Sequence, residues 1–291
     1  MCRLYALLAN APTRLDCSLA CAGNNLMRQS LRDREGFQHA HGWGLAAYVD
    51  GKPVLSRDTR AAFESEGFER LAARSRTQAA IAHVRRATVG AHSLENTHPF
   101  RHGRFSFAHN GTIPGFERVR HRRLAATRVS QRALIRGQTD SEHLFHFILS
   151  RWSGSGGAGL AEAVHSAVGE VLGWCEEFAP GESVGLNVVL TDGRELVATR
   201  FGRTLWFLEH EGELRCSSCG SVHAVQRNAG TAYRAIELAS EPVTPDAGWC
   251  ALPEACVLGV DAAHGLRLMP LASHRAVPAS GRQPLRRQHA V

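Results

Sequence analysis

Three pairs of strand-like runs, each joined by a short glycine turn, constrain the fold of this chain more than any other feature of its sequence. The segments GLAAYV-DG-KPVLSR and GLNVVLT-DG-RELVATR place Asp50-Gly51 and Asp192-Gly193 between apolar runs. The segment TLWFLEHEGELRCSS repeats the arrangement around Glu211-Gly212 with a looser turn. Because Asp-Gly readily adopts the positive φ angles of tight turns, these segments predict β-hairpins and therefore antiparallel sheet.

Further strands and helices are predicted from the apolar patterns around these hairpins. The segments QAAIAHVR, RFSFAH, ACVLGVDA and GLRLMPL are typical of strands, the last two as a final pair. AAFESEGFERLAARS predicts one helix, and DSEHLFHFILSRW predicts another with Asp140 as its N-cap. LAEAVHSAVGEVLGWCEEF predicts a longer helix, and the short Gly/Ser loop before it predicts antiparallel packing of the last two helices. Strands before and after a helical pair indicate a layered α+β domain.

The totals are those of a globular protein that can hold its own core. The chain has 291 residues, of which 44% are hydrophobic and 21% are charged. No apolar run reaches the length of a membrane span and no signal-peptide pattern opens the chain. We therefore expect no membrane association and a cytoplasmic location. We also expect one domain over residues 1–275 and a basic, disordered tail over residues 276–291.

The positive charge does not indicate a nucleic-acid partner. The formal net charge is +7, and Lys52 is the sequence's one lysine, so arginine carries nearly all of the positive charge. Arginines gather between Arg118 and Arg136 and again in the tail GRQPLRRQHAV. Aromatic residues for stacking bases do not alternate with these arginines. We interpret the two clusters as a solvated helix face and a frayed terminus, and we predict no nucleic-acid binding.

The cysteines do not form an obvious disulfide or metal pattern. Eight are scattered along the chain, and Cys216 and Cys219 make a C-x2-C pair with His223 close behind. A structural zinc site needs four ligands, and the sequence offers no clear fourth. We interpret these cysteines as ordinary strand or turn residues, and we predict neither a metal nor a cofactor. An alternative of another class is a non-catalytic module that holds a metal at Cys216 and Cys219 or an anionic partner at the arginines.

Cys2 could act as a nucleophile in a way that the other cysteines could not. If Met1 is removed, the thiol of Cys2 and a free α-amine belong to the same residue. An α-amine has an unperturbed pKa of about 7.7–8.0, so near pH 7 it can accept the thiol proton, which a main-chain amide cannot do. The alternative is that Cys2 is simply a small apolar residue at the start of a strand.

Five further residues supply the groups that a thiol attacking an amide would need. The attack creates an oxyanion, which requires preorganised donors. Asn110 and Gly111, expected on a turn just beyond a strand, offer a side-chain amide and a backbone N–H. Arg85 can hold a substrate carboxylate with two parallel hydrogen bonds, the Thr88 hydroxyl can assist, and Asp140 can receive an ammonium.

Taken in order, these stretches resemble the class II glutamine amidotransferases of the N-terminal nucleophile (Ntn) hydrolase superfamily. The resemblance is carried by MC, HGWG, AHVRRATVG, ENTHPF, AHNGTI, TDSE and LASEPVTPDAGW. It is strongest to the stand-alone branch that includes the YafJ-like and ergothioneine-pathway amidohydrolases. In the synthase members of the class a Trp commonly follows the arginine, whereas here Arg86 follows Arg85.

The resemblance implies a fold and a reaction. The fold would be a four-layer α/β/β/α sandwich of two mainly antiparallel sheets with helices outside. Cys2 would be the nucleophile, and Asn110 and Gly111 would form the oxyanion hole. A γ-glutamyl amide would be cleaved through a γ-glutamyl thioester, without a catalytic histidine. We therefore interpret the histidines of these motifs as packing or supporting groups: His83, His98 and His109.

The resemblance also implies how the substrate is held and leaves two functions open. Arg85 and Thr88 match the residues that hold the glutamine α-carboxylate, and Asp140 matches the acid that receives the α-amino group. One function releases ammonia from glutamine for a separate synthetase subunit as partner. The other removes a γ-glutamyl group from a biosynthetic conjugate, as in ergothioneine-type pathways. Both need the same γ-glutamyl pocket, so these motifs do not separate them.

Overall fold

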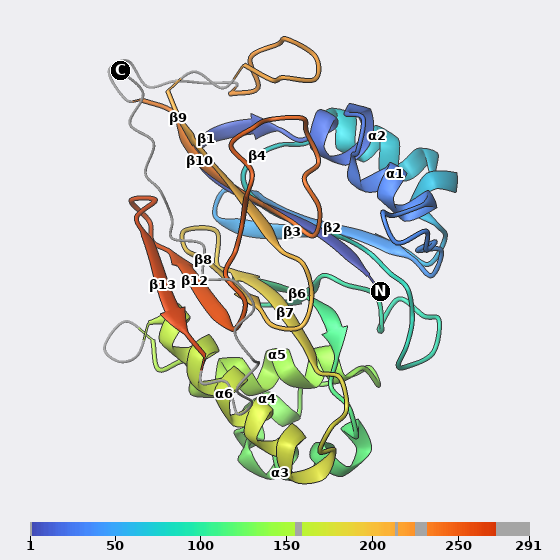
Figure 1. The fold of residues 1–291 in the computed structure, drawn as a ribbon, viewed down its shortest axis with the longest axis vertical. Coiled ribbons are helices and arrows are strands. Elements are labelled where there is room, and N and C mark those ends of the chain that lie inside the picture. Colours follow the sequence, from blue (N-terminus) through green and yellow to red (C-terminus); the bar gives the residue numbers. More distant parts are fainter. Residues whose placement is uncertain (1, 155–158, 213–214, 225–231, 272–291) are drawn as a thin grey trace.

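Two antiparallel sheets stacked face to face form the centre of the molecule (Figure 1). The computed structural model describes residues 2–154, 159–212, 215–224 and 232–271. The strands of the first sheet are, in spatial order, β11 (Cys250–Ala251), β9 (Trp206–Glu211), β10 (Arg234–Ala239), β1 (Arg3–Arg14), β4 (Arg76–Val84), β2 (Trp43–Val49) and β3 (Lys52–Asp58). Those of the second are β13 (Leu266–Pro270), β12 (Cys256–Val260), β8 (Leu196–Arg200), β7 (Gly185–Thr191), β6 (Phe105–Thr112) and β5 (Phe100–His102).

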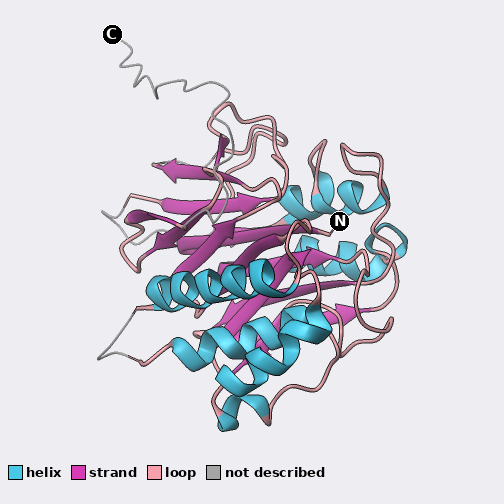
Figure 2. Ribbon diagram, turned by 60° about the horizontal axis from the view of Figure 1, so that its bottom comes forward, coloured by secondary structure: helices cyan, strands magenta, loops and turns pink. Residues whose placement is uncertain are grey.

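Helices cover the outer faces of both sheets. The outer face of the first sheet carries η1 (Cys17–Cys21), α1 (Leu26–Leu31), η2 (Ala62–Glu64) and α2 (Glu66–Arg74). The second sheet carries α3 (Phe116–Ala126), α4 (Val129–Arg132), α5 (Asp140–Arg151) and α6 (Leu160–Phe178), which Figure 2 brings forward. The order is helices, sheet, sheet, helices, so the predicted four-layer α+β sandwich is confirmed.

Strand β1 lies at the centre of the first sheet and is buried on both faces. Leu4 and Leu8 face the second sheet, where they pack in the cluster that contains Ile81. Tyr5 and Leu7 face the helices on the other side of the sheet. Because successive side chains of a strand point to opposite faces, an apolar run such as LYALLA can fill both layers at once.

The clearest local patterns of the sequence are confirmed. Asp50 and Gly51 have φ angles of 49° and 73°, and they join β2 to β3 as a tight hairpin. The helices α5 and α6 pack antiparallel, since Arg151 pairs with Glu170 at 2.7 Å while the Phe147 and Trp174 rings lie 5.1 Å apart.

The prediction of the third hairpin is wrong, because the described residues just after the turn do not form the second strand. Strand β9 ends at Glu211 as expected, but it pairs with β10 and β11 instead of the residues that follow Gly212. Residues 215–224 make a compact loop of their own, in which Arg215 bridges to Val222. The sequence of this loop is dominated by Ser, Cys and Gly, which do not favour a strand.

Two expectations about the second helical layer are corrected. The N-cap of α5 is Thr139, whose hydroxyl accepts from the Glu142 N–H at 3.2 Å, so Asp140 lies in the first turn. The arginine-rich helix α3 is not wholly solvated, because Arg123 is buried. Its guanidinium donates to the Asp140 carbonyl oxygen at 3.0 Å and lies over the Phe116 ring.

Two expectations from the sequence concern the membrane and the tail. Among the described helices, none has the length and apolar character needed to cross a bilayer. The predicted boundary between residues 275 and 276 and the arginine-rich tail lie outside the described residues.

Candidate active site

Cys2 lies immediately before β1, where the pairing of Arg3 with Val84 brings the end of β4 alongside it. The Arg86 N–H donates to the Cys2 sulfur at 3.2 Å, and the thiol donates to the Arg86 carbonyl oxygen at 3.4 Å. Burial raises the pKa of the Cys2 thiol, although the Arg86 main chain and the charges of Arg85 and Arg3 act in the opposite direction. The sulfur is thus held at a fixed place, but its ionisation needs a proton acceptor.

Arg3 fixes the main chain of Cys2 from the other side. Its guanidinium donates to the Cys2 carbonyl oxygen at 3.2 Å. The same group pairs with Asp33 at 2.6 Å and with Glu241 at 2.9 Å, and only 3% of Arg3 is exposed. Two carboxylates around one buried guanidinium satisfy a charge that would otherwise be costly to desolvate. Sequence reasoning missed Arg3 and Asp33, while Glu241 lies in the quoted segment LASEPVTPDAGW.

Arg85 begins the loop that connects β4 to the site. Its side chain is buried and donates to the carbonyl oxygens of Val89 at 3.0 Å, Gly90 at 3.4 Å and Ala91 at 3.1 Å. Burial lowers the pKa of Arg85. Arg86, the residue that departs from the synthase pattern, stacks its guanidinium over the Phe37 ring at 4.1 Å.

The segment HGWG holds the base of this loop. His41 and Gly42 exchange main-chain hydrogen bonds with Arg85, and the Ala87 N–H donates to His41 Nδ1 at 2.8 Å. Burial lowers the pKa of His41, which favours the neutral ring that can accept this bond. At Gly44 a Cβ would lie 2.2 Å from the His98 carbonyl oxygen, so the close approach of these two segments requires glycine.

Asn110 and Gly111 lie inside β6, and the prediction of a turn at these residues is wrong. They pair with Asn187 and Leu186 of β7, so the sheet overrides the turn preference of Asn-Gly. A Cβ at Gly111 would lie 2.0 Å from the Gly185 carbonyl oxygen. The glycine therefore serves close strand packing at this position.

A serine links Asn110 to the strand that follows Cys2. The Ser240 hydroxyl oxygen accepts from the Leu4 N–H at 3.0 Å and lies 3.3 Å from Asn110 Nδ2. Asn110 Oδ1 is buried and makes no hydrogen bond to any described residue. Rotating the amide by 180° would let Ser240 donate to Oδ1, which would leave the two N–H groups of Asn110 for another acceptor.

The remaining predicted residues meet at the end of β6. The Thr88 and Thr112 hydroxyl oxygens lie 3.3 Å apart, and the Ile113 N–H donates to Asp140 Oδ2 at 2.9 Å. Asp140 is 4% exposed, and its other oxygen accepts from the Ser141 hydroxyl at 3.1 Å. All six residues singled out in the sequence therefore lie along one connected set of contacts between the ends of β1, β4 and β6.

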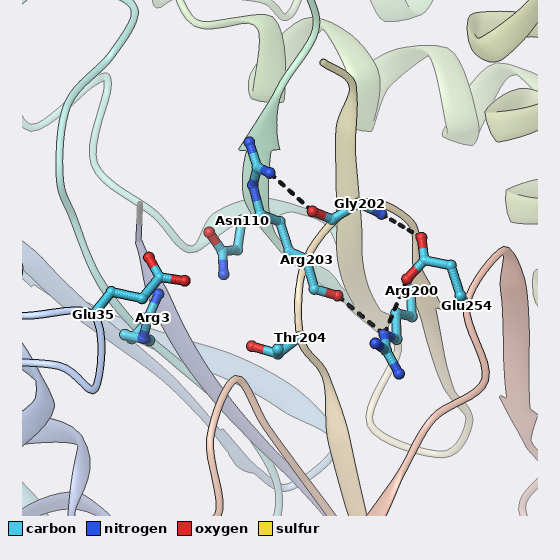
Figure 3. Close-up of a pocket in the computed structure, with 8 residues that line it drawn as sticks. All are labelled: Arg3, Glu35, Asn110, Arg200, Gly202, Arg203, Thr204 and Glu254. Carbon is cyan, nitrogen blue, oxygen red and sulfur yellow. Dashed lines mark hydrogen bonds and ion pairs between the residues drawn. The ribbon is translucent and has the colours of Figure 1, made fainter. Parts of the chain in front are cut away.

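A cavity of about 300 Å³ opens beside Asn110 (Figure 3). It is lined by Arg3, Glu35, Asn110, Arg200, Gly202, Arg203, Thr204 and Glu254. Arg200 pairs with Glu254 at 3.2 Å, whereas Arg203 has no carboxylate within 4.0 Å among the described residues. Its Nη1 donates to the Gly202 carbonyl oxygen at 2.8 Å, and its buried Nε has no described partner. Arg203 thus has a donor free toward the cavity, and the carboxylates of Glu35 and Glu254 in the cavity wall attract its charge without an ion pair within 4.0 Å.

The histidines of the motifs pack in the interior, as predicted. The His83 and His98 rings are buried with their centroids 4.3 Å apart, and their nitrogens make no hydrogen bonds to other described residues. Burial lowers the pKa of His83 to about 3 and that of His98 well below its usual range. His109 lies 2.9 Å from both the Ser141 hydroxyl and the Gly185 carbonyl oxygen.

Comparison with known proteins places this chain in a family. The family model described as "Glutamine amidotransferases class-II" matches residues 1–264. The probable glutamine amidotransferase DUG3 of Saccharomyces cerevisiae is 28% identical, over 89% of this chain and 82% of that protein. The gamma-glutamyl-hercynylcysteine sulfoxide hydrolase of Mycolicibacterium smegmatis is 27% identical, over 91% and 97%. A solved class-II domain protein from Silicibacter pomeroyi has a similar fold, with a TM-score of 0.60 at 20% identity over 93% of this chain and all of that one.

The buried histidine pair predicts a pH dependence of stability. Folded His83 stays neutral down to about pH 3, whereas unfolded His83 binds a proton below about pH 6.5, so acidification through this window favours unfolding. In His83→Phe the fall in unfolding free energy between pH 6.5 and 4.5 should be shallower by about 1.2 kcal/mol per pH unit on average, measured by urea denaturation. The control His121→Phe replaces an exposed histidine. Equal slopes for wild type and His83→Phe would contradict the expectation.

Proposed function

Because the chain belongs to the class II glutamine amidotransferases, we propose that it hydrolyses a γ-glutamyl amide with Cys2 as the N-terminal nucleophile. The observation that most supports this function is the position of the Cys2 sulfur. It lies against the Arg86 main chain at 3.2 Å, at the point where β1 meets the loop of Arg85. Ser240 connects the nearby Leu4 to Asn110, which supports assigning the Asn110 amide to the same site.

In the proposed reaction, removal of Met1 frees the α-amine of Cys2, which accepts the thiol proton. This acceptor matters because burial raises the pKa of the Cys2 thiol. The sulfur attacks the γ-carbonyl carbon, and the Asn110 amide and the Gly111 N–H stabilise the oxyanion. The C–N bond then breaks, and the leaving amine takes the proton from the Cys2 ammonium. The α-amine of Cys2 then activates a water molecule, which hydrolyses the thioester, releases glutamate and restores the Cys2 thiol.

The glutamyl end of the substrate is assigned to the groups at the ends of β4 and β6. Arg85 has five N–H groups and three carbonyl partners among the described residues, which leaves donors for an α-carboxylate. Thr88 is exposed beside Thr112 and can add a hydroxyl. The Asp140 carboxylate, held by the Ile113 N–H, is proposed to receive the α-ammonium group.

The leaving group is proposed to be an amine that itself carries a carboxylate. Ammonia would not need the charged cavity beside Asn110, whereas Arg203 offers that cavity a cation that forms no ion pair within 4.0 Å among the described side chains, although Glu35 and Glu254 attract it from the cavity wall. A γ-glutamyl conjugate is therefore favoured over glutamine, and the similarity to a gamma-glutamyl-hercynylcysteine sulfoxide hydrolase supports this choice. Delivery of ammonia to a separate synthetase subunit stays the alternative. A cytoplasmic location is part of the same proposal.

Replacing the nucleophile tests the function directly. Cys2→Ala should abolish hydrolysis of γ-glutamyl amides without lowering the melting temperature, because the half-buried thiol contributes little to the core. Cys2→Ser should leave little activity, since a hydroxyl is a far poorer nucleophile at neutral pH. Cys21→Ala, which changes an exposed cysteine, is the control. Wild-type turnover by Cys2→Ala would rule out the mechanism.

Ser240 is expected to act through Asn110. In Ser240→Ala the amide loses its orienting hydroxyl, so kcat should fall by about tenfold while KM changes little, a smaller effect than the roughly hundredfold loss expected for Asn110→Ala. Steady-state kinetics with a γ-glutamyl amide measures both. A purely structural serine would instead lower the melting temperature and leave kcat per folded chain unchanged, which would remove the positioning role.

Arg203 should decide which leaving groups are preferred. Arg203→Gln should lower kcat/KM for γ-glutamyl dipeptides by roughly ten- to a hundredfold, the effect of losing a charge-assisted hydrogen bond, and leave γ-glutamyl anilides unaffected. Arg122→Gln, on the exposed face of α3, is the matched control. An equal loss for both substrate types, or no loss for the dipeptide, would contradict the assigned leaving group.

A further inference from the structure

Four side chains of types that commonly bind metals meet beyond the C-terminal end of β1, whereas Cys2 precedes its N-terminal end. Cys17 is the first residue of η1, and Cys216, Cys219 and His223 belong to the loop that follows β9. One sulfur or ring nitrogen from each lies within 4.8 Å of all the others. The sequence alone offers no fourth ligand for Cys216, Cys219 and His223, because the missing cysteine comes from a distant part of the chain.

We propose that Cys17, Cys216, Cys219 and His223 bind one structural zinc ion. Three thiolates and one imidazole are a common ligand set of structural zinc sites. A tetrahedral zinc with Zn–S of about 2.3 Å and Zn–N of about 2.0 Å holds its ligand atoms roughly 3.5–3.8 Å apart. The Cys219 sulfur and His223 Nε2 are 3.4 Å apart, close to that separation.

The loop is shaped to present two thiolates to one point. Gly220 has a φ of 69°, and its N–H donates to the Cys216 carbonyl oxygen at 2.8 Å, which closes a tight turn around Cys219. The Ser218 N–H donates to the Cys216 sulfur at 3.4 Å. Backbone N–H groups aimed at sulfur favour the thiolate, which is the form that binds metal.

The closeness of the sulfurs also favours a bound cation. Three of the four ligand atoms are cysteine sulfurs, and they lie within 4.8 Å of one another. Three thiolates at such distances repel one another unless a cation lies between them. A dication at their centre would remove this repulsion, and its binding would release the thiol protons.

The position of the cluster indicates a structural role. Four protein ligands fill a tetrahedral site, so no position is left for a reacting molecule. Figure 1 shows β1 running away from the N label, and Cys17 follows its far end. The loop is joined to this end by the Arg14 N–H, which donates to the His223 carbonyl oxygen at 3.0 Å. The buried apolar cluster under this loop contains only Cys17, Ala22 and Cys216 among the described residues. A metal would therefore stabilise a loop that has almost no hydrophobic core.

Metal analysis of the purified chain, expressed with zinc and never exposed to chelator, tests the site. We expect about one zinc per chain in the wild type and in Cys2→Ala, because Cys2 is not a ligand. Cys17→Ser and Cys216→Ser should lose most of the zinc, whereas Cys21→Ser, an exposed cysteine at the end of η1, should keep it. Full zinc occupancy in Cys17→Ser would overturn the ligand set.

Two measurements on the wild type keep the proposal testable if these variants fold poorly. Reconstitution with Co²⁺ should give the intense visible absorption of a tetrahedral site together with thiolate-to-cobalt charge transfer. In a separate sample, titration of thiols after denaturation in chelator without reductant should count all eight cysteines of the chain. A wild-type chain without zinc and without the cobalt spectrum would overturn the proposal. So would six titratable thiols, which would indicate a disulfide in place of the metal.

Discussion

The antiparallel register of β1 and β4 is the constraint on which the site depends. Because Arg3 pairs with Val84, Cys2, which precedes Arg3, and Arg85, which follows Val84, are neighbours at the ends of these two central strands. The Arg86 main chain can then hold the Cys2 sulfur, and Arg3 can hold its carbonyl oxygen. A shift of one residue would turn every side chain of β1 to the opposite layer, so the two buried faces of this strand enforce the register.

Buried charge is arranged in pairs around these strand ends. Arg3 is enclosed by Asp33 and Glu241, and Asp33 also lies 2.9 Å from a His39 ring whose pKa burial lowers to about 4. Removing one member would leave an uncompensated charge, which is more costly than the loss of the pair as a whole. Such networks fix positions tightly, and here they fix the start of β1, where Ser240 connects Leu4, two residues after Cys2, to Asn110.

Features that depend on local chemistry could be predicted from the sequence. The turn at Asp50-Gly51 and the helix over residues 160–178 follow from backbone preference and apolar periodicity. Features that depend on distant pairing could not. The partners of β9 begin only at Arg234 and Cys250, and β7 draws the Asn110-Gly111 dipeptide into a strand although its composition favours a turn.

Only those residues of the candidate site that stand in recognisable motifs could be predicted from the sequence. The motifs singled out Cys2, Arg85 and Asn110. Ser240 lies in the quoted segment LASEPVTPDAGW and Arg3 follows Cys2, but nothing in the sequence marked either, because their roles come from contacts with distant residues. Cys17 shows the same limit, because a ligand that folding brings beside Cys216 and Cys219 has no spacing by which sequence could recognise it.

The central claim is that the mature chain begins at Cys2 and reacts through its sulfur. Intact-mass measurement of active protein, before and after incubation with a glutamine analogue that carries an electrophile in place of its amide, tests it most directly. The account predicts a mass that lacks Met1 and a single adduct that peptide mapping locates on Cys2. Active protein that retains Met1, or an adduct on any other cysteine, would contradict it.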